Sequence, residues 1–212
     1  MTAIKRTVGI LIFDDVEILD FCGPFEVFSS ADEPGVEDRD ARRLFKAVTV
    51  APEKRTIVCR GGLLVEPHYA LADAPLFDII VLPGGYGTRT ARFDPAIQAW
   101  VRKHLAAGAL TTSVCTGLVF LAQIGAIDGM PVTSHWETLD WFRSEFPALD
   151  VRGDQRVIDQ GQIVTSAGVS AGIDMALSLV ARLHGIDIAR ETARGMEYVW
   201  NSAGLPSGSP AT

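Results

Sequence analysis

The chain has 212 residues, of which 48% are hydrophobic and 21% are charged, and its net charge is −7 at pH 7. This balance is typical of one globular domain and excludes a disordered or collagen-like chain. Because the sequence has no long basic run and no apolar run of roughly 20 residues, we expect neither nucleic-acid binding nor a membrane span. The N-terminus lacks the features of a signal peptide, so we expect a cytosolic protein.

Apolar strands alternate with helical segments along the first half of the chain. The continuous apolar run Val8–Phe13 predicts a strand that is buried on both faces. Leu19–Ser30 has a helical pattern, in which Pro24 is interpreted as a first-turn proline. The further predicted elements are an exposed loop at Ala31–Arg43, a strand at Phe45–Val50, a hairpin of Thr56–Cys59 and Leu63–Glu66 around Gly61-Gly62, a strand at Asp78–Leu82, and a helix at Pro95–Ala107 capped by Asp94.

The same alternation continues in the second half. A strand at Ala109–Val114 is followed at once by a helix at Thr116–Ile124. Ser134 and Glu137 have the spacing of a capping box at the start of the next helix. The remaining predicted elements are a short strand at Val132–Ser134, a helix from about Trp136 to Phe146, a hairpin of Arg156–Asp159 and Gln162–Thr165, and helices at Ser170–His184 and Ala189–Asn201.

This alternation predicts a doubly wound α/β fold, with a largely parallel sheet sandwiched by helices. Neither an internal repeat nor a linker divides the chain, so we expect one domain over residues 1–205 and a flexible Gly/Ser/Pro tail at 206–212. Ligands of such folds bind beyond the carboxyl ends of the strands. Three loops leave such ends, at Asp14–Asp20, Pro83–Thr88 and Val114–Gly117.

Cys115 is the most informative residue, because it stands between a predicted strand and a predicted helix. A tight strand-to-helix turn pushes a side chain out above the sheet, as the nucleophile elbow of hydrolases does. A helix N-terminus at this point would favour the thiolate and lower the pKa of the thiol. A buried structural cysteine is the alternative, and the pattern alone does not separate the two.

Asp20 opens the helix after the first strand and is a candidate for handling a proton or a water molecule. A helix-terminal carboxylate, stabilised by the helix dipole, is the better explanation when the residue is taken alone. The neighbouring Asp14, Asp15 and Glu17 are expected to be solvated.

Four more residues near the predicted strand ends are candidates. Gly84 and Gly85 allow a close approach of the backbone to a ligand and offer N–H groups to developing negative charge, although an ordinary tight turn explains them equally well. Thr116 has a hydroxyl and an N–H for the same site, or it caps its helix. His135 is a candidate base for Cys115 or a structural histidine.

The three cysteines, Cys22, Cys59 and Cys115, form no CxxC pair, and the four histidines are scattered. This spacing suits reduced thiols and offers no zinc site.

Several stretches together resemble the ThiJ/PfpI superfamily, in the family order and over nearly the whole chain. They are ILIFDDV at Ile10–Val16, ILDFCGPFEV at Ile18–Val27, IIVLPGGY at Ile79–Tyr86, SVCTG at Ser113–Gly117, TSHW at Thr133–Trp136 and SAGVSAGIDM at Ser166–Met175. The resemblance implies a flavodoxin-like sandwich with a cysteine at the elbow, which falls on Cys115. Members are usually dimers, so it also implies a homodimer.

The pair formed by Asp20 in LDxxGP and Thr116 after the cysteine resembles the isocyanide hydratase branch. Protease-like and glyoxalase-like members instead have a glutamate after the first strand, and many have a histidine after the cysteine. The resemblance therefore implies that Cys115 attacks a small isocyanide and that Asp20 handles a water or a proton. The product is an N-substituted formamide, and no metal or organic cofactor is required.

Two other functions stay open. The same motifs resemble the sensor half of AraC-type regulators, which favours a ligand or redox sensor; this chain ends at Thr212, which leaves no room for their DNA-binding domain. Glyoxalase- or amidase-type activity is less favoured because the glutamate and the histidine are missing. Phe21, Tyr86, Trp136 and Trp200 are the expected apolar walls of the site.

Overall fold

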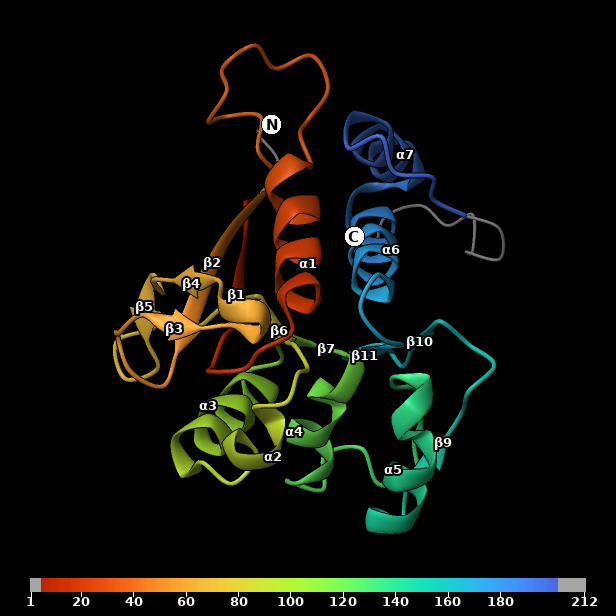
Figure 1. Cartoon of the computed structure of the whole chain (residues 1–212). Helices are drawn as coiled ribbons and strands as arrows, with labels where there is room; N and C mark the ends of the chain where they lie inside the picture. Colours follow the sequence, from red (N-terminus) through yellow and green to blue (C-terminus); the bar gives the residue numbers. More distant parts are fainter. Residues whose placement is uncertain (1–4, 202–212) are drawn as a thin grey trace.

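Figure 1 shows the computed structural model of the protein, in which residues 5–201 are described. Within these residues seven strands form the main sheet, in the order β10-β11-β7-β6-β1-β2-β5. Their bounds are β1 Arg6–Leu11, β2 Phe45–Ala51, β5 Tyr69–Ala70, β6 Ile79–Leu82, β7 Leu110–Val114, β10 Val157–Asp159 and β11 Ile163–Ser166.

All neighbouring strands of this sheet are parallel except β10 and β11, which form an antiparallel hairpin. The central strands are buried on both faces, which explains why their sequences are continuously apolar rather than alternating. Because β1, β6, β7 and β11 run in the same direction, the loops that follow them meet at one edge of the sheet. The doubly wound, largely parallel fold predicted from the sequence is confirmed.

Helices cover the sheet from two sides (Figure 1). Helices α1, α6 and α7 pack together on one side, and α3 and α4 contact each other on the other. The bounds are α1 Ile18–Ser30, α2 Thr88–Ala91, α3 Pro95–Ala106, α4 Leu118–Ala122, α5 Leu139–Glu145, α6 Ala171–His184 and α7 Ile186–Gly195, with 3₁₀ turns at Arg60–Gly62, Cys115–Gly117 and Trp136–Thr138.

The predicted hairpins and the cap of α3 are confirmed. Strands β3 (Ile57–Val58) and β4 (Leu64–Val65) pair antiparallel, and the Asp94 side chain accepts a hydrogen bond from the Ala96 N–H. The predicted strand at Val132–Ser134 is instead β8 (Pro131–Val132), which pairs with β9 (Asp150–Val151) outside the main sheet.

The structure also differs from the predictions at the end of α7, at Pro24 and after Cys115. Helix α7 ends at Gly195 instead of Asn201, because the chain turns at Glu197, whose φ is +52°. Pro24 lies in the interior of α1, not in its first turn. The helix predicted at Thr116–Ile124 is a 3₁₀ turn followed by the five-residue α4.

Helix α1 packs closely against α6 at two glycines, Gly172 and Gly23. A Cβ atom on Gly172 would lie 3.3 Å from Pro24 Cγ and 3.1 Å from Val114 Cγ1, so the absent side chain brings the two helices together above β7. A Cβ on Gly23 would lie 2.9 Å from Ile173 Cγ1. This contact fixes the start of α1, which carries Asp20, relative to the end of β7.

The described residues contain no helix that is long and apolar enough to cross a membrane. The predicted tail at 206–212 lies outside the described residues, and the single domain over 1–205 stays a prediction.

Candidate functional site

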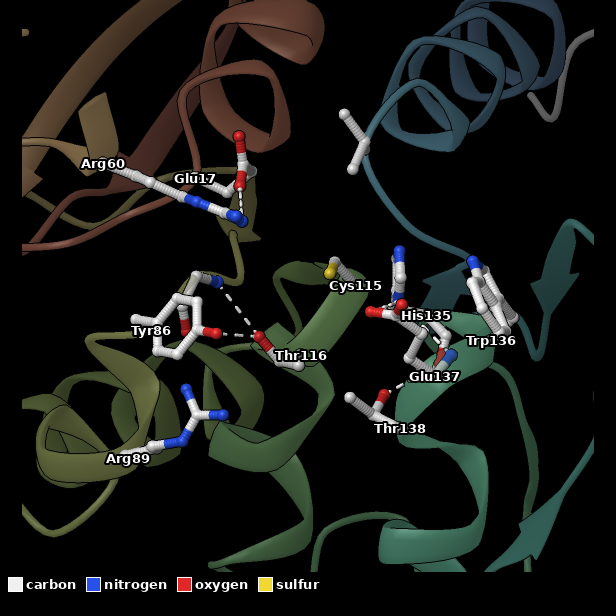
Figure 2. A pocket seen from close by; sticks show the side chains of 12 residues that line it. Glu17, Arg60, Tyr86, Arg89, Cys115, Thr116, His135, Trp136, Glu137 and Thr138 are labelled. Carbon is white, nitrogen blue, oxygen red and sulfur yellow. Dashed lines mark hydrogen bonds and ion pairs between the residues drawn. The ribbon is translucent and has the colours of Figure 1, made fainter.

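A cavity of about 350 Å³ opens at the edge of the sheet where the parallel strands end. Cys115 lies in it, and Figure 2 shows side chains from several loops around the sulfur. The residues that line the cavity are Glu17, Arg60, Gly85, Tyr86, Arg89, Cys115, Thr116, His135, Trp136, Glu137, Thr138 and Val169. Each of the three loops predicted from the strand ends contributes at least one residue.

Cys115 has the backbone geometry of an elbow. Its φ is +58°, a left-handed conformation that is uncommon for any residue other than glycine. The Cys115 N–H donates to the Ala167 carbonyl at 3.2 Å, and the Ser134 hydroxyl donates to the Cys115 carbonyl at 2.7 Å. These two bonds hold the strained residue in place, with 8% of its surface exposed.

Gly117 makes the elbow tight. A Cβ atom at this position would lie 1.9 Å from the Leu82 carbonyl oxygen, so only glycine lets the turn after Cys115 pass the end of β6. The Ser134 hydroxyl donates to the Cys115 carbonyl of the elbow instead of capping a helix. The Glu137 N–H donates to the His135 ring. The capping box predicted for Ser134 and Glu137 is therefore wrong.

Asp20 is completely buried in the first turn of α1, next to Cys115 and behind the exposed lining of the cavity. Its Oδ2 accepts a 2.8 Å hydrogen bond from the Gly84 N–H, whereas its Oδ1 has no hydrogen-bond partner in residues 5–201. Burial raises the pKa of Asp20 to about 7, and the negative charge of Glu17 adds to this effect. Asp20 therefore exchanges a proton near neutral pH.

Burial, followed by the nearby charge of Asp20, raises the pKa of the Cys115 thiol to about 12. This corrects the prediction of a lowered pKa. The helix dipole has little effect here because α4 has only five residues, and loss of hydration disfavours the thiolate. The resting pair is thus a neutral thiol beside a carboxyl group that can take its proton.

The backbone N–H groups of Gly84 and Gly85, in the loop after β6, already donate hydrogen bonds within the protein. Gly84 donates to Asp20, and Gly85 donates to the Thr116 hydroxyl oxygen at 3.0 Å. The Thr88 hydroxyl lies 3.4 Å from the same Thr116 oxygen. The backbone N–H and the hydroxyl of Thr116 both lie near the Cys115 sulfur and act to lower the pKa of the thiol, against the larger effect of burial.

His135 lines the same cavity as Cys115. Its Nδ1 accepts from the Glu137 N–H at 3.3 Å, and no hydrogen bond joins the ring to Cys115 among the residues that the structure describes. The ring packs on Gly168, where a Cβ atom would lie 2.0 Å from His135 Cδ2. The structure thus places His135 in the cavity wall.

Glu17 and Arg60 were missed as site residues. Glu17, expected to be solvated, forms a 2.7 Å ion pair with Arg60 at the cavity, and only 20% of its side chain is exposed. Arg60 comes from the turn of the β3–β4 hairpin, far along the chain, so only the folded structure brings the two together.

The expected apolar walls are partly right. Tyr86 and Trp136 line the cavity, whereas Phe21, in the hydrophobic core, and Trp200, packed against the core, are not among its lining residues. Val169, with φ +53°, also lines the cavity; its place in the SAGVSAG stretch was the one sequence signal for it.

Within residues 5–201, no group of three or more His, Cys, Asp or Glu side chains is placed to hold a metal ion.

The comparisons with known proteins agree with this architecture. The model of the DJ-1/PfpI family matches residues 6–182. The isonitrile hydratase of Pseudomonas putida is 31% identical over 97% of this chain and 83% of its own length. The HTH-type transcriptional regulator CdhR of Pseudomonas aeruginosa is 33% identical over 76% of this chain, which corresponds to 48% of the regulator.

Solved structures give the same result. The crystal structure of a ThiJ/PfpI family protein from Pseudomonas syringae has a TM-score of 0.81 and 27% identity, and covers 98% of this chain and 81% of that one. Drosophila melanogaster DJ-1beta, at 20% identity, shares the fold with a TM-score of 0.78 over 93% of this chain and 100% of that one. With a cysteine elbow on a flavodoxin-like sheet and a family model that matches most of its length, this chain belongs to the DJ-1/PfpI family.

Proposed function

We propose that the protein is a cofactor-free hydratase that converts isocyanides into N-substituted formamides. The observation that carries this proposal is the buried Asp20 beside Cys115, which lines the cavity, with the pKa of Asp20 raised to about 7. The resemblance to an isonitrile hydratase over 97% of the chain supports the same reaction. Cytosolic location and a homodimer stay predictions.

The first step joins the substrate to the enzyme. The isocyanide carbon is a soft electrophile, and sulfur is a soft nucleophile. As Cys115 Sγ forms its bond to this carbon, the thiol proton passes to the ionised Asp20, which delivers it to the same carbon. The product is a thioimidate, R–N=CH–S, on Cys115. The pKa of the free thiol is raised to about 12, so proton transfer during attack replaces a standing thiolate.

The second step releases the product. Water adds to the thioimidate carbon and gives one proton to the nitrogen, by way of Asp20. The tetrahedral adduct then collapses: the C–S bond breaks, the hydroxyl becomes the formyl oxygen, and its proton returns to the Cys115 sulfur. The sum is one isocyanide plus one water giving one formamide.

The loop residues have positioning roles in this proposal. Thr116 accepts from Gly85 through its hydroxyl, while its backbone N–H faces the sulfur. Gly84 orients Asp20 through the 2.8 Å hydrogen bond. His135 and Trp136 form a wall of the cavity that holds the substituent of the isocyanide.

The test is formamide production from simple alkyl and aryl isocyanides by the wild-type protein. The Cys115→Ala variant is the negative control, and Cys22→Ala is the matched control, because Cys22 does not line the cavity. Formamide production that needs Cys115 and not Cys22 supports the proposal. Absence of turnover by folded wild-type protein with every isocyanide overturns it.

A ligand sensor is the second candidate, because the chain matches 48% of a transcriptional regulator. It predicts saturable binding of a small molecule without turnover. A redox sensor fits the site less well, since sensing cysteines have a low pKa and are accessible, whereas burial raises the pKa of Cys115 to about 12.

A further inference from the structure

Arg60 and Arg89 both line the cavity, but only the charge of Arg60 is neutralised by an ion pair among residues 5–201. Arg60 forms the 2.7 Å ion pair with Glu17. Arg89, from α2, makes no ion pair with any residue between 5 and 201. Figure 2 shows both guanidinium groups on the Tyr86 side of the cavity, that of Arg60 against Glu17 and that of Arg89 next to the Tyr86 ring. Arg89 takes no part in the two proposed steps of hydration.

Arg89 is held in position. Its guanidinium carbon lies 4.3 Å from the centroid of the Tyr86 ring, and that of Arg60 lies 5.3 Å from the same centroid. The start of α2 is tied to the loop after β6, because the Thr88 hydroxyl donates to the Gly85 carbonyl at 2.8 Å. A cation stacked on a ring and anchored in this way loses little conformational freedom when it binds a ligand.

The opposite wall has the opposite charge. Glu137 lies beside His135, with 3.8 Å between its Oε2 and His135 Nδ1, and Figure 2 shows both on the far side of Cys115 from Arg89. Trp136 adds an exposed apolar surface there. A negatively charged group of a ligand would therefore be attracted to the Arg89 side and kept away from the Glu137 side.

We propose that the cavity selects isocyanides that carry a carboxylate, and that Arg89 is the specificity-determining residue that binds this carboxylate. This inference rests on the proposed function for the reacting end of the substrate. A guanidinium group presents paired N–H donors that match the two oxygens of a carboxylate. A cavity of about 350 Å³ holds a small molecule of this kind, with the isocyanide carbon at Cys115.

The experiment measures kcat/KM for straight-chain isocyano carboxylates with one to four methylenes, each against its methyl ester. The variants are Arg89→Met, Arg89→Lys and the matched control Arg102→Met, an exposed arginine of α3 outside the cavity. We expect at least one acid to be preferred over its ester by roughly 10- to 100-fold, the range for hydrogen bonds to a charged group. Arg89→Met should remove this preference, Arg89→Lys should keep part of it, and Arg102→Met should keep all of it.

A binding measurement separates this inference from the proposed function. Calorimetry with the corresponding N-formyl amino acids and their methyl esters reports on the carboxylate without any turnover. If isocyanides are hydrated but acids and esters react alike at every chain length, the role of Arg89 is wrong and the hydratase stands. If nothing is hydrated but the N-formyl acids bind the wild type and not Arg89→Met, the carboxylate site stands and the hydratase is wrong. If there is neither turnover nor binding, both are wrong.

Discussion

The backbone N–H of Gly84 donates a 2.8 Å hydrogen bond to the buried carboxylate of Asp20, and so ties the loop after β6 to the first turn of α1. This bond uses one carboxylate oxygen and leaves Oδ1 without a partner in residues 5–201. The Cys115 thiol is the neighbouring group with a proton to give. The fold thus places a buried carboxyl group beside the nucleophile, away from bulk water.

Replacing Asp20 by Asn should lower the rate of isocyanide hydration by about 10²- to 10⁴-fold, the usual contribution of a positioned proton carrier. In the wild type, kcat/KM should rise as the pH passes through about 7, because burial raises the pKa of Asp20 to that value and only the ionised form accepts the thiol proton. Initial rates between pH 5 and 9 test both statements. An unchanged rate in Asp20→Asn would make Asp20 a structural residue.

The same carboxyl makes stability depend on pH. The pKa of Asp20 is raised from 3.8 to about 7 in the folded protein, so the folded state holds a proton that the unfolded state releases between these two values. Stability should therefore fall as the pH rises from about 4 to 7, by up to about 4 kcal/mol from this group. Asp20→Asn removes this contribution, so the variant should gain stability relative to the wild type between pH 5 and pH 8 in urea unfolding. A difference that is independent of pH would contradict the raised pKa.

Alkylation of Cys115 should respond to Asp20→Asn in the opposite direction from hydration. The charge of Asp20 adds to the raised pKa of the thiol, and the uncharged Asn amide removes this contribution. Iodoacetamide at pH 8 to 9 should therefore label Cys115 faster in the variant than in the wild type, as followed by peptide mass spectrometry. Cys22 serves as the internal reference, since burial and then a different carboxylate, Glu26, raise its pKa. Slower labelling of Cys115 in the variant would show that Asp20 helps to form the thiolate in the resting protein.

The layout of the site could be predicted from the sequence because it follows from strand order. Apolar runs followed by the loops Asp14–Asp20, Pro83–Thr88 and Val114–Gly117 indicate the carboxyl ends of parallel strands, and such ends meet at one edge. The structure confirms this edge and the elbow.

The electrostatics of the site could not be predicted in the same way. Burial sets the pKa of Cys115, and burial is decided by packing of residues far apart in the chain. The pairing of Glu17 with Arg60 likewise depends on how the β3–β4 hairpin folds over the site. Ser134 was interpreted as a helix cap because its spacing fits one, but its hydroxyl binds the Cys115 carbonyl instead.

Gly84→Ala should reduce both activity and stability. A Cβ atom at Gly84 would lie 2.6 Å from the Thr116 nitrogen and 2.8 Å from Asp20 Oδ2, so the loop has to move and the hydrogen bond to Asp20 is disturbed. Overpacking of this kind costs about 1–3 kcal/mol. Gly195→Ala is the matched control, because a Cβ there meets no atom within 4 Å among the described residues. Thermal unfolding and hydration rates should separate the two variants, and equal behaviour would mean that the loop adapts without moving Asp20.

Cys115→Ala and Cys115→Ser should abolish isocyanide hydration and leave the fold intact. The sulfur forms a bond to the substrate in every turnover of the proposed reaction, so no partial activity is expected. Serine is close to cysteine in size, and the backbone bonds from Ser134 and to Ala167 do not involve the side chain, so the elbow stays in place. A hydroxyl is a weaker and harder nucleophile than a thiol, and Asp20 with a pKa of about 7 is too weak a base to compensate. The measurement is formamide production by the wild type and both variants, with circular dichroism to verify folding. Comparable turnover by folded Cys115→Ala would show that water, activated by Asp20, attacks the isocyanide without a covalent intermediate.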